Sequence, residues 1–498
     1  MGGRRDFEAA LVQLAAAEKL SPDNAVIHLV RGDLFLQVCN LDRARNDYAR
    51  AEQISQDLAH IRLAVYYQET GNYAEAEAQY KAALEIDPGQ AMTHAALGWV
   101  FALQGRFPEA MSEDGTASGI NSNSPVVLEY RARALEQMDQ FEQAETALEQ
   151  GNQLDTRDEG ILVDWAEDLV WLKEYEKAKQ KYDEALRIAP ALPAALAGEA
   201  NLMSYQGDYR GAISGYEKAI QVCPSELTAL TGIGYSYRSL GEYEEAKRWF
   251  EKAKQSLPLL PDGYVGSGAL NNSVGNYAAA FSDANEALAR DPRVTYAYVV
   301  KGVALVGMRQ YREAIKEFRQ AMQVHPRDAD PWEYWGNLLQ QRGDYKGAAA
   351  KYNRAMELDP RSSEVPIDWG DMLFSSGDYR GAEKEYRAAL TAAPHDPEIQ
   401  AKLATTLARM KRMPEAMVLL EQAKATAPRL PYVNFKWGQV LEEQGDLKGA
   451  EERYEAACHD YPKSEAGKLA TGALARLHSQ RTAATGKRTH ANRIFEEE

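Results

Sequence analysis

Small and apolar residues recur along the chain at a fixed interval. The segment "GDYKGAAAKYNRAMELDP" at residues 343–360 returns as "GDYRGAEKEYRAALTAAP" at residues 377–394, a shift of 34 residues. In each copy an aromatic residue, an alanine three positions later and a second alanine seven positions after that share one side of a 3.6-residue period. The pattern predicts a short amphipathic helix in every copy.

The first of these alanines can be followed through almost the whole chain. It recurs every 34 residues, with one interval of 32, and a second series seven residues later is alanine everywhere except at Gly151. Alanine on a helix face lets two helix axes approach closely, and the aromatic three positions before it fills the neighbouring space. The first series comprises Ala10, Ala44, Ala76, Ala110, Ala144, Ala178, Ala212, Ala246, Ala280, Ala314, Ala348, Ala382, Ala416 and Ala450.

Each repeated unit is predicted to contain two helices. A glycine stands two residues before the aromatic in many units, where a left-handed residue ends the first helix. Asp, Asn or Glu usually follows and can start the second helix. These glycines are Gly71, Gly105, Gly207, Gly241, Gly275, Gly343, Gly377 and Gly445.

The unit resembles the tetratricopeptide repeat, whose signature is W-x2-L-G-x2-Y, then A-x3-F and then P over 34 residues. One unit of this chain has Trp332, Trp335, Gly336, Leu339, Ala348, Tyr352 and Pro360 in that order. The resemblance extends over residues 4–464. It implies an all-α, right-handed superhelical solenoid of antiparallel helix pairs, in which each unit contacts only its neighbours.

The repeat divides the chain into four segments. One unit is expected to be weak, because Asp114 replaces an aromatic residue and Gly115 and Gly119 each cost about 1 kcal/mol of helix propensity. The half repeat at the start leaves open whether a longer chain begins upstream. The expected segments are a half repeat with a second helix only (1–24), thirteen tandem units (25–464), a capping helix (465–480) and a disordered tail (481–498).

Charge and cysteine content narrow the possible functions. A net charge of −17, from 57 basic and 74 acidic residues, argues against nucleic acid and anionic membranes as partners. No run of apolar residues approaches the roughly 18 needed to insert into a membrane. Cys39, Cys223 and Cys458 are far apart, so their spacing indicates neither a disulfide framework nor a metal site.

Motifs for catalysis are missing from the sequence, so we expect no enzyme activity, cofactor or metal. The eight histidines are scattered, and there is no HExxH, GxSxG or phosphate-binding glycine loop. The start "RRDF" at residues 4–7 resembles a twin-arginine export signal, but Glu8, Gln13 and Glu18 interrupt the apolar run that should follow. A cytoplasmic location is therefore expected, with a periplasmic one as the alternative if an upstream signal is missing.

The resemblance implies that the first helix of each unit lines a concave groove, through its second, fifth, sixth, ninth, twelfth and thirteenth residues. Some family members bind a carboxylate with a clamp that has lysine at the fifth and asparagine at the ninth position of a first helix. In this chain Asn201 and Asn337 stand at the ninth position, but the fifth position holds Ala197 and Glu333, so the clamp is not matched. Chaperone C-terminal tails are therefore not the expected ligand.

Three successive units have glycine at the sixth groove position. Either these glycines let neighbouring helices pack tightly, or they leave a channel for an extended peptide. In the second case, Asn side chains would bond the peptide backbone while Tyr and Arg hold its side chains. The candidate groove residues are Gly198, Gly232, Gly266, Asn201, Tyr205, Tyr235, Arg238 and Asn272.

The sequence thus predicts a non-catalytic scaffold that binds partner proteins or peptides in its groove. Two alternatives stay open. The chain could be the targeting part of a larger enzyme or export machine, or a module that stacks on further copies of itself as a homo-oligomer.

Overall fold

The computed structural model describes residues 2–172, 174–359, 364–459, 462 and 464–479, and in these residues it contains helices, turns and no strand. The all-α solenoid of antiparallel helix pairs is confirmed. A leading helix, α1 (Gly2–Leu20), precedes the pairs, and a helix over residues 465–479 follows them. The first helices of the pairs are α2 (Ala25–Gln37), α4 (Gln56–Glu69), α6 (Ala91–Leu103), α8 (Pro125–Glu136), α10 (Glu159–Trp171), α12 (Pro193–Tyr205), α14 (Leu227–Ser239), α16 (Asp262–Ser273), α18 (Thr295–Gly307), α20 (Asp330–Gln341), α22 (Glu364–Ser376), α24 (Pro397–Arg409) and α26 (Pro431–Gln444). The second helices are α3 (Leu41–Ile54), α5 (Tyr73–Ile86), α7 (Phe107–Ile120), α9 (Phe141–Leu154), α11 (Tyr175–Ile188), α13 (Tyr209–Val222), α15 (Tyr243–Ser256), α17 (Tyr277–Arg290), α19 (Tyr311–Val324), α21 (Tyr345–Leu358), α23 (Tyr379–Ala392), α25 (Met413–Thr426) and α27 (Leu447–His459).

The helices form two compact units. Unit 1 consists of Met1–Leu202, Ser214–Gly232 and Lys252–Asp262. Unit 2 consists of Met203–Ile213, Ile233–Glu251 and Gly263–Glu498. Helices α12 to α16 contribute residues to both units.

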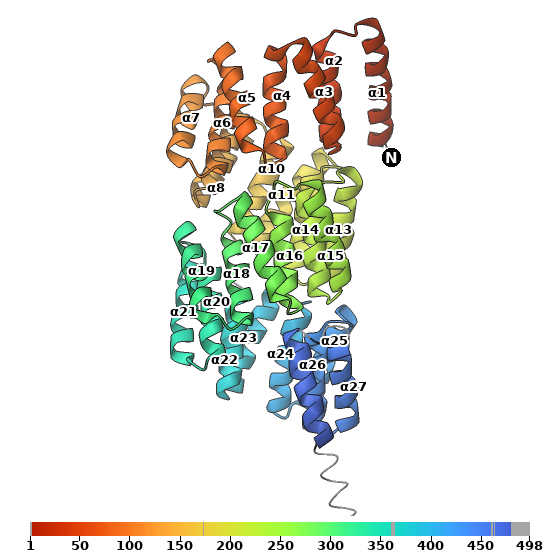
Figure 1. The fold of residues 1–498 in the computed structure, drawn as a ribbon, viewed down its shortest axis with the longest axis vertical. Helices are drawn as coiled ribbons and strands as arrows, with labels where there is room; N and C mark the ends of the chain where they lie inside the picture. The colour runs from red at the N-terminus through yellow and green to blue at the C-terminus, as the bar shows by residue number, and fades with distance from the viewer. Residues whose placement is uncertain (1, 173, 360–363, 460–461, 463, 480–498) are drawn as a thin grey trace, which may run out of the picture. The chain divides into compact units, whose positions relative to one another are not determined.

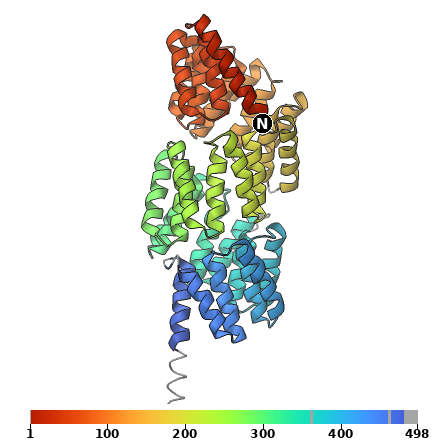
Figure 2. The ribbon, with the colours of Figure 1, turned by 90° about the vertical axis from the view of Figure 1, so that its right-hand side faces the viewer.

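In ten of the pairs, the first helix packs against the second helix that follows it: these first helices are α2, α4, α6, α8, α10, α18, α20, α22, α24 and α26. In unit 1, α4 packs on α5 and α6 on α7, and α5 also contacts α6, so that these helices stand side by side (Figure 1). The side view shows the same antiparallel pairing for the red and orange helices (Figure 2). In unit 2, α18 packs on α19 and α20 on α21 in the same way.

The turn between the two helices of a pair needs a left-handed residue. The eight glycines expected at this place all have positive φ angles, between +74° and +87°. In four other turns the same position is held by Cys39, Asp139, Arg309 and Lys411, with φ between +51° and +64°. A side chain at such an angle costs about 1–2 kcal/mol, which explains why glycine is the usual residue there.

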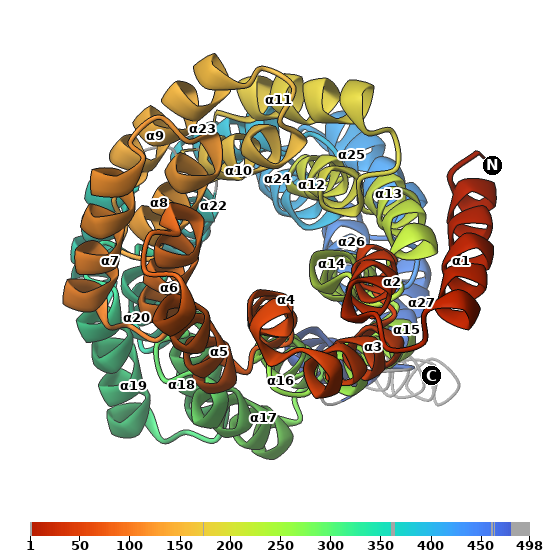
Figure 3. The ribbon, with the colours of Figure 1, turned by 90° about the horizontal axis from the view of Figure 1, so that it is seen from above.

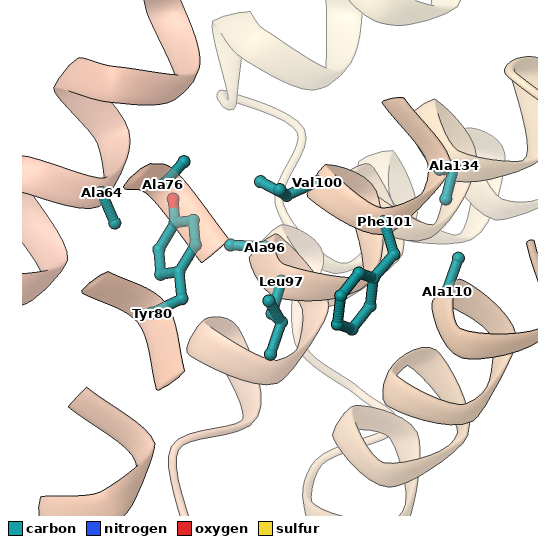
Figure 4. Packing of buried hydrophobic residues seen from close by; sticks show 10 residues of the cluster. Ala64, Ala76, Tyr80, Ala96, Leu97, Val100, Phe101, Ala110 and Ala134 are labelled. Carbon is teal, nitrogen blue, oxygen red and sulfur yellow. The ribbon is translucent and has the colours of Figure 1, made fainter. Parts of the chain in front are cut away.

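The alanine series forms the contact between helices, as predicted. Every member from Ala44 to Ala450 is 0% exposed. Around Ala76 and Ala110, the rings of Tyr80 and Phe101 fill the space beside the helix contact (Figure 4). Since these alanines are fully buried between helices, a larger side chain at an alanine position should cost about 1–3 kcal/mol.

The fully buried aromatic of a pair follows the alanine by four residues. Tyr352 is 0% exposed, whereas Tyr345, three residues before Ala348, is 43% exposed. Tyr345 is the first residue of α21, at the outer edge of the pair, and Tyr352 lies one turn beyond the alanine against the first helices. The space beside the helix contact is thus filled mainly by the later ring.

Helix α7 is continuous despite its unusual sequence. Asp114 is 7% exposed and accepts hydrogen bonds of 2.9 and 3.1 Å from Nε of Arg131. An ion pair therefore takes the place of the usual aromatic ring. A Cβ at Gly115 or Gly119 would meet no atom within 4 Å, so these glycines serve no packing role. The low stability expected for this helix stays a prediction.

The last described helix, over residues 465–479, buries Ala466, Ala470, Ala473 and Leu477. The predicted disordered tail at residues 481–498 lies outside the described residues, and the division into thirteen units stays a prediction. In the part of the chain that the structure describes, no helix combines the length and the apolar character required to cross a membrane.

Candidate partner-binding groove

The first helices line the inner side of each unit. In unit 1, α4, α6, α8 and α10 lie on the inner side of the curve that these helices follow, and α5, α7, α9 and α11 lie outside them (Figure 3). In unit 2, α22, α24 and α26 lie inside α23, α25 and α27 (Figure 3). Residues on the inner helices are thus the ones available to a ligand in a groove.

Unit 2 contains a cavity of about 200 Å³ on this inner side, named here the Arg238 cavity. It lies where the last turns of α14 and α16 meet α18 and α20. Two residues of the predicted site, Arg238 and Asn272, belong to its wall. The lining residues are Arg238, Ala269, Asn272, Ser273, Tyr296, Val299, Val300, Val303 and Tyr334.

Arg238 makes few polar contacts for a guanidinium group. Its Nη1 donates a long hydrogen bond of 3.4 Å to Oγ of Ser273, and its Nε is buried without a hydrogen-bond partner among the described residues. The guanidinium carbon lies 5.5 Å from the ring centre of Tyr235. Arginine carries five N–H donors in a planar fork, and the described residues accept one hydrogen bond from Arg238.

The surroundings of Arg238 keep it charged. Burial disfavours the charge, but Tyr296, Tyr235 and Tyr334 and the carboxylate of Glu398 more than compensate for it, so the pKa of Arg238 lies above its usual value. Each of these groups belongs to unit 2. A cation that has lost part of its hydration and lacks a bonded carboxylate attracts a negatively charged or carbonyl-bearing ligand.

Asn272 and Tyr235 are fixed by internal contacts. Nδ2 of Asn272 donates a 2.8 Å hydrogen bond to the backbone oxygen of Val300, and its Oδ1 is buried without a partner among the residues that the structure describes. The ring of Tyr235 packs edge-on against Phe250, with 5.1 Å between ring centres. Both side chains therefore shape the site, and both also hold helices together.

The glycines of the predicted channel lie against aromatic rings. A Cβ at Gly198 would come closer than 3.0 Å to the ring of Tyr182, and one at Gly232 would meet Tyr216 in the same way. In unit 2, a Cβ at Gly266 would meet the ring of Phe250. Rings from the preceding second helices thus fill the space beside these glycines, and the choice between close helix packing and a peptide channel stays open.

The remaining predicted residues are divided between the units. Asn201, in unit 1, accepts a hydrogen bond from the hydroxyl of Tyr216. Tyr205, in unit 2, is 49% exposed. The structure therefore brings Arg238 and Asn272 together in the wall of one cavity, with the ring of Tyr235 beside Arg238, while Asn201 takes part in a contact within the other unit.

A second polar group on the inner side of unit 2 was not among the predicted site residues. Lys402 forms an ion pair with Asp371, and its ammonium lies 5.7 Å from the ring centre of Tyr432. Lys436 lies 5.3 Å from the same ring. Burial lowers the pKa of Lys436 to about 8, and the nearby Lys402 adds to this effect.

The inner side of unit 1 contains a paired arginine, and its contacts are named here the Arg133 network. Nε of Arg133 donates to Asp164 at 2.6 Å, and Nη2 donates to Glu129 at 2.7 Å and to Asp164 at 3.2 Å. The guanidinium also lies 4.9 Å from the ring centre of Trp99. Burial raises the pKa of Glu129 to about 7 and outweighs the attraction of Arg133.

Sequence comparison identifies the family of the helix pairs. Profiles of the tetratricopeptide repeat match residues 61–125, 227–256, 299–363, 373–434 and 432–464. Together these ranges cover about half of the chain and lie in both units.

The chain belongs to the tetratricopeptide repeat family.

Solved structures with similar folds include other tetratricopeptide repeat arrays. The chain is similar to the "APC/C hetero-tetramer Cut9-Hcn1" (13% identity, 94% of this chain and 98% of that chain, TM-score 0.43). It is also similar to yeast Tom70 (18% identity, 86% of this chain and 96% of that chain, TM-score 0.39). A third similar structure is a tetratricopeptide repeat protein from Parabacteroides merdae (19% identity, 50% of this chain and 98% of that chain, TM-score 0.37). No curated protein sequence matches the chain.

Sequence reasoning selected Arg238 but did not select Lys402. Arg238 was singled out because it stands near three glycines, each of which lies against an aromatic ring. Lys402 and Lys436 occupy the sixth position of their first helices, so a census of charged residues at that position would have found both.

Proposed function

We propose that this tetratricopeptide repeat protein is a non-catalytic scaffold that binds a segment of a partner protein along the inner side of unit 2. The observation that carries the proposal is the Arg238 cavity, in which a charged guanidinium makes one long hydrogen bond and no ion pair with the described residues. The partner contributes a carboxylate or a carbonyl oxygen to Arg238.

The chemistry of Arg238 suits this role. A planar guanidinium can donate two parallel N–H bonds to one carboxylate, and charge-assisted bonds of this type are about twice as strong as neutral ones. Its partial burial has already removed part of its water, so a ligand displaces little further hydration. A carboxylate on a partner segment therefore gains both geometry and charge complementarity here.

The rest of the cavity wall offers apolar contact beside the cation. Tyr296, Tyr334 and Val303 line the same cavity. Aromatic side chains give a large contact area while losing little conformational freedom. A segment with an acidic residue next to an apolar one would match this combination.

The other inner arginine is a weaker candidate for the same role. Arg133 already makes three hydrogen bonds with Glu129 and Asp164, so a ligand carboxylate would have to displace one of them. Binding at the Arg133 network would cost an existing pair, whereas binding at Arg238 would add a new one.

Site-directed photocrosslinking in whole cells tests the proposal. A photoreactive amino acid at Val303, inside the Arg238 cavity, should yield a crosslinked partner. The control places it at Arg248 of the same unit, a residue whose side chain is 74% exposed. We expect a defined product from position 303 that is missing from position 248.

Each outcome of this experiment is informative. Products of equal yield from both positions, or none from position 303, would contradict a site at the Arg238 cavity. A product from position 303 with the mass of two chains would identify a second copy of the protein as the partner.

A further inference from the structure

Two cysteines that are 184 residues apart in the sequence are joined by a disulfide bond. Cys39 lies in the turn between α2 and α3, and Cys223 directly follows α13; their Cα atoms are 4.9 Å apart. Both belong to unit 1. Ser225 adds a 3.2 Å hydrogen bond from its hydroxyl to the backbone oxygen of Cys39. The sequence spacing had indicated no disulfide, so that expectation was wrong: the repeat fold brings distant turns together.

The bond lies in a type of contact that the fold makes elsewhere without cysteines. In unit 1, a Cβ at Gly71 would touch the side chain of Leu260. In unit 2, the hydroxyl of Tyr209 donates a 2.6 Å hydrogen bond to Asp396, 187 residues further along the chain. In each case a turn after a first helix lies close to the start of a first helix more than five repeats later.

The two cysteines differ in accessibility. Cys223 is 3% exposed, whereas Cys39 is partly exposed in its turn. Cys39 also has a φ of +51°, at the position where eight other turns have glycine. Backbone preference therefore does not explain a cysteine at this position, whereas the bond to Cys223 does.

We propose that Cys39 and Cys223 form a reversible redox clasp that fixes the first helix pair of unit 1 to the end of α13. In the oxidising direction, the Cys39 thiolate attacks a small-molecule disulfide such as glutathione disulfide and releases one thiol. The Cys223 thiolate then attacks the sulfur of Cys39 in the mixed disulfide and releases the second thiol. Two electrons pass to the small-molecule disulfide, and the two protons of the cysteines end on the released thiols.

The clasp controls the mobility of the first helix pair. In a tetratricopeptide repeat array each helix pair is held by contacts with its neighbours, and local opening of a pair breaks those contacts. With the bond intact, the α2–α3 turn has a second covalent anchor. After reduction, the hydrogen bond from Ser225 to Cys39 remains, but the covalent link to Cys223 is lost. The same contact in unit 2 has no sulfur and does not respond to redox conditions.

Hydrogen exchange of the full chain, oxidised and reduced, tests the proposal. We expect amides at residues 36–44 and 220–229 to exchange about tenfold faster after reduction with dithiothreitol. Residues 206–213, at the corresponding contact of unit 2, should exchange at an unchanged rate.

Variants separate the clasp from general effects of reduction. Cys39→Ser and Cys223→Ser should each show the fast exchange without reductant. Cys458→Ser, which changes the remaining cysteine, should behave like the wild type in both states. If a serine variant fails to fold, the comparison of oxidised and reduced wild-type protein still decides the question.

Peptide mapping after equilibration in glutathione buffers shows whether the bond forms and reverses. We expect a peptide that links Cys39 to Cys223 in oxidising buffer and its loss in reducing buffer. Failure to detect this peptide in fully oxidising buffer would overturn the proposal. Exchange rates that are the same with and without the bond would also overturn it, because the disulfide would then not restrain the first helix pair.

Discussion

Unit 1 and unit 2 are built from the same kind of helix pair with buried alanines at equivalent positions, but an arginine on their first helices makes different hydrogen bonds in each unit. Arg133 in unit 1 makes three short or moderate hydrogen bonds with Glu129 and Asp164. Arg238 in unit 2 makes one bond of 3.4 Å with a serine. Arg133 is thus paired with carboxylates of its own unit, and we propose that Arg238 is the arginine that receives a ligand.

In this fold, the residues that stabilise the helix packing differ from the residues that face the inner side. The alanines and rings between helices fix the packing, and they leave the inner positions of the first helices free to vary. Charge at these positions can therefore change without changing the fold. Whether a cation is structural or functional depends on how many of its donors already have partners.

The largest expected effect is the loss of Arg133. Arg133→Gln leaves the carboxylates of Glu129 and Asp164 together without a cation, and breaking a buried pair in this way costs about 3 kcal/mol. Urea unfolding followed by circular dichroism should show this loss as a lower midpoint. Arg238→Gln in the same assay should cost less than about 1 kcal/mol, because it removes one long hydrogen bond. Equal losses in both variants would remove the distinction between the two arginines.

A pH dependence should come next in size, and it concerns Asp168 in α10 of unit 1. Asp168 is 0% exposed, and neither of its oxygens has a hydrogen-bond partner among the described residues. Burial raises its pKa from 3.8 to about 7, and Glu145 and Glu142 of α9 add to this effect. Because the folded protein binds this proton more tightly than the unfolded chain, the stabilising contribution is complete below pH 3.8. It is lost as the pH rises through about 7.

The variant Asp168→Asn isolates this contribution. Relative to the variant, the wild type should gain roughly 2 kcal/mol of unfolding free energy between pH 8 and pH 5. Urea unfolding at both pH values measures the gain. If the wild type and Asp168→Asn respond identically to pH, Asp168 is already ionised at pH 5 in the folded protein. Burial would then not raise its pKa.

Glycines that lie against rings should matter equally in both units. Gly198→Ala in unit 1 and Gly266→Ala in unit 2 place a methyl group against Tyr182 and Phe250, which should cost about 1–3 kcal/mol in each case. Thermal unfolding of the two variants checks this. A stable variant that has lost partner binding would instead favour the channel interpretation of these glycines.

The smallest effect should be a gain in stability in α7. Gly115→Ala and Gly119→Ala add a methyl group where nothing lies within 4 Å, so each should stabilise the protein by up to about 1 kcal/mol. Hydrogen exchange of residues 107–120 should slow accordingly. The two variants also serve as matched controls for the glycines that face rings. A loss of stability would show that α7 is packed more tightly than its described contacts indicate.

Most of the fold could be predicted because the repeat appears in the local sequence. The alanine period marks the helix contacts, and the glycines at positive φ mark the turns, so both depend only on nearby residues. The ion pair of Asp114 with Arg131 was less accessible to sequence reasoning, because Asp114 appeared only as a missing aromatic residue. Its partner comes from the next helix pair.

The site could be predicted only in part, because its contacts depend on residues far apart. Arg238 and Asn272 were both selected, and they line one cavity because they stand at the same position of successive first helices. The internal bonds of Asn201 and Asn272, by contrast, require the side-chain arrangement. The disulfide between Cys39 and Cys223 depends on contacts that span more than five repeats, and no local pattern reports such contacts.

The affinity of the crosslinked partner for Arg238→Gln tests the central claim most directly. With purified partner and isothermal titration, we expect this variant to bind at least about tenfold more weakly than the wild type, since it loses a charge-assisted contact of about 1.5–3 kcal/mol. Arg248→Gln, on the outer side of the same unit, should bind like the wild type. Full affinity in Arg238→Gln, with an unchanged unfolding midpoint, would contradict a binding site at the Arg238 cavity.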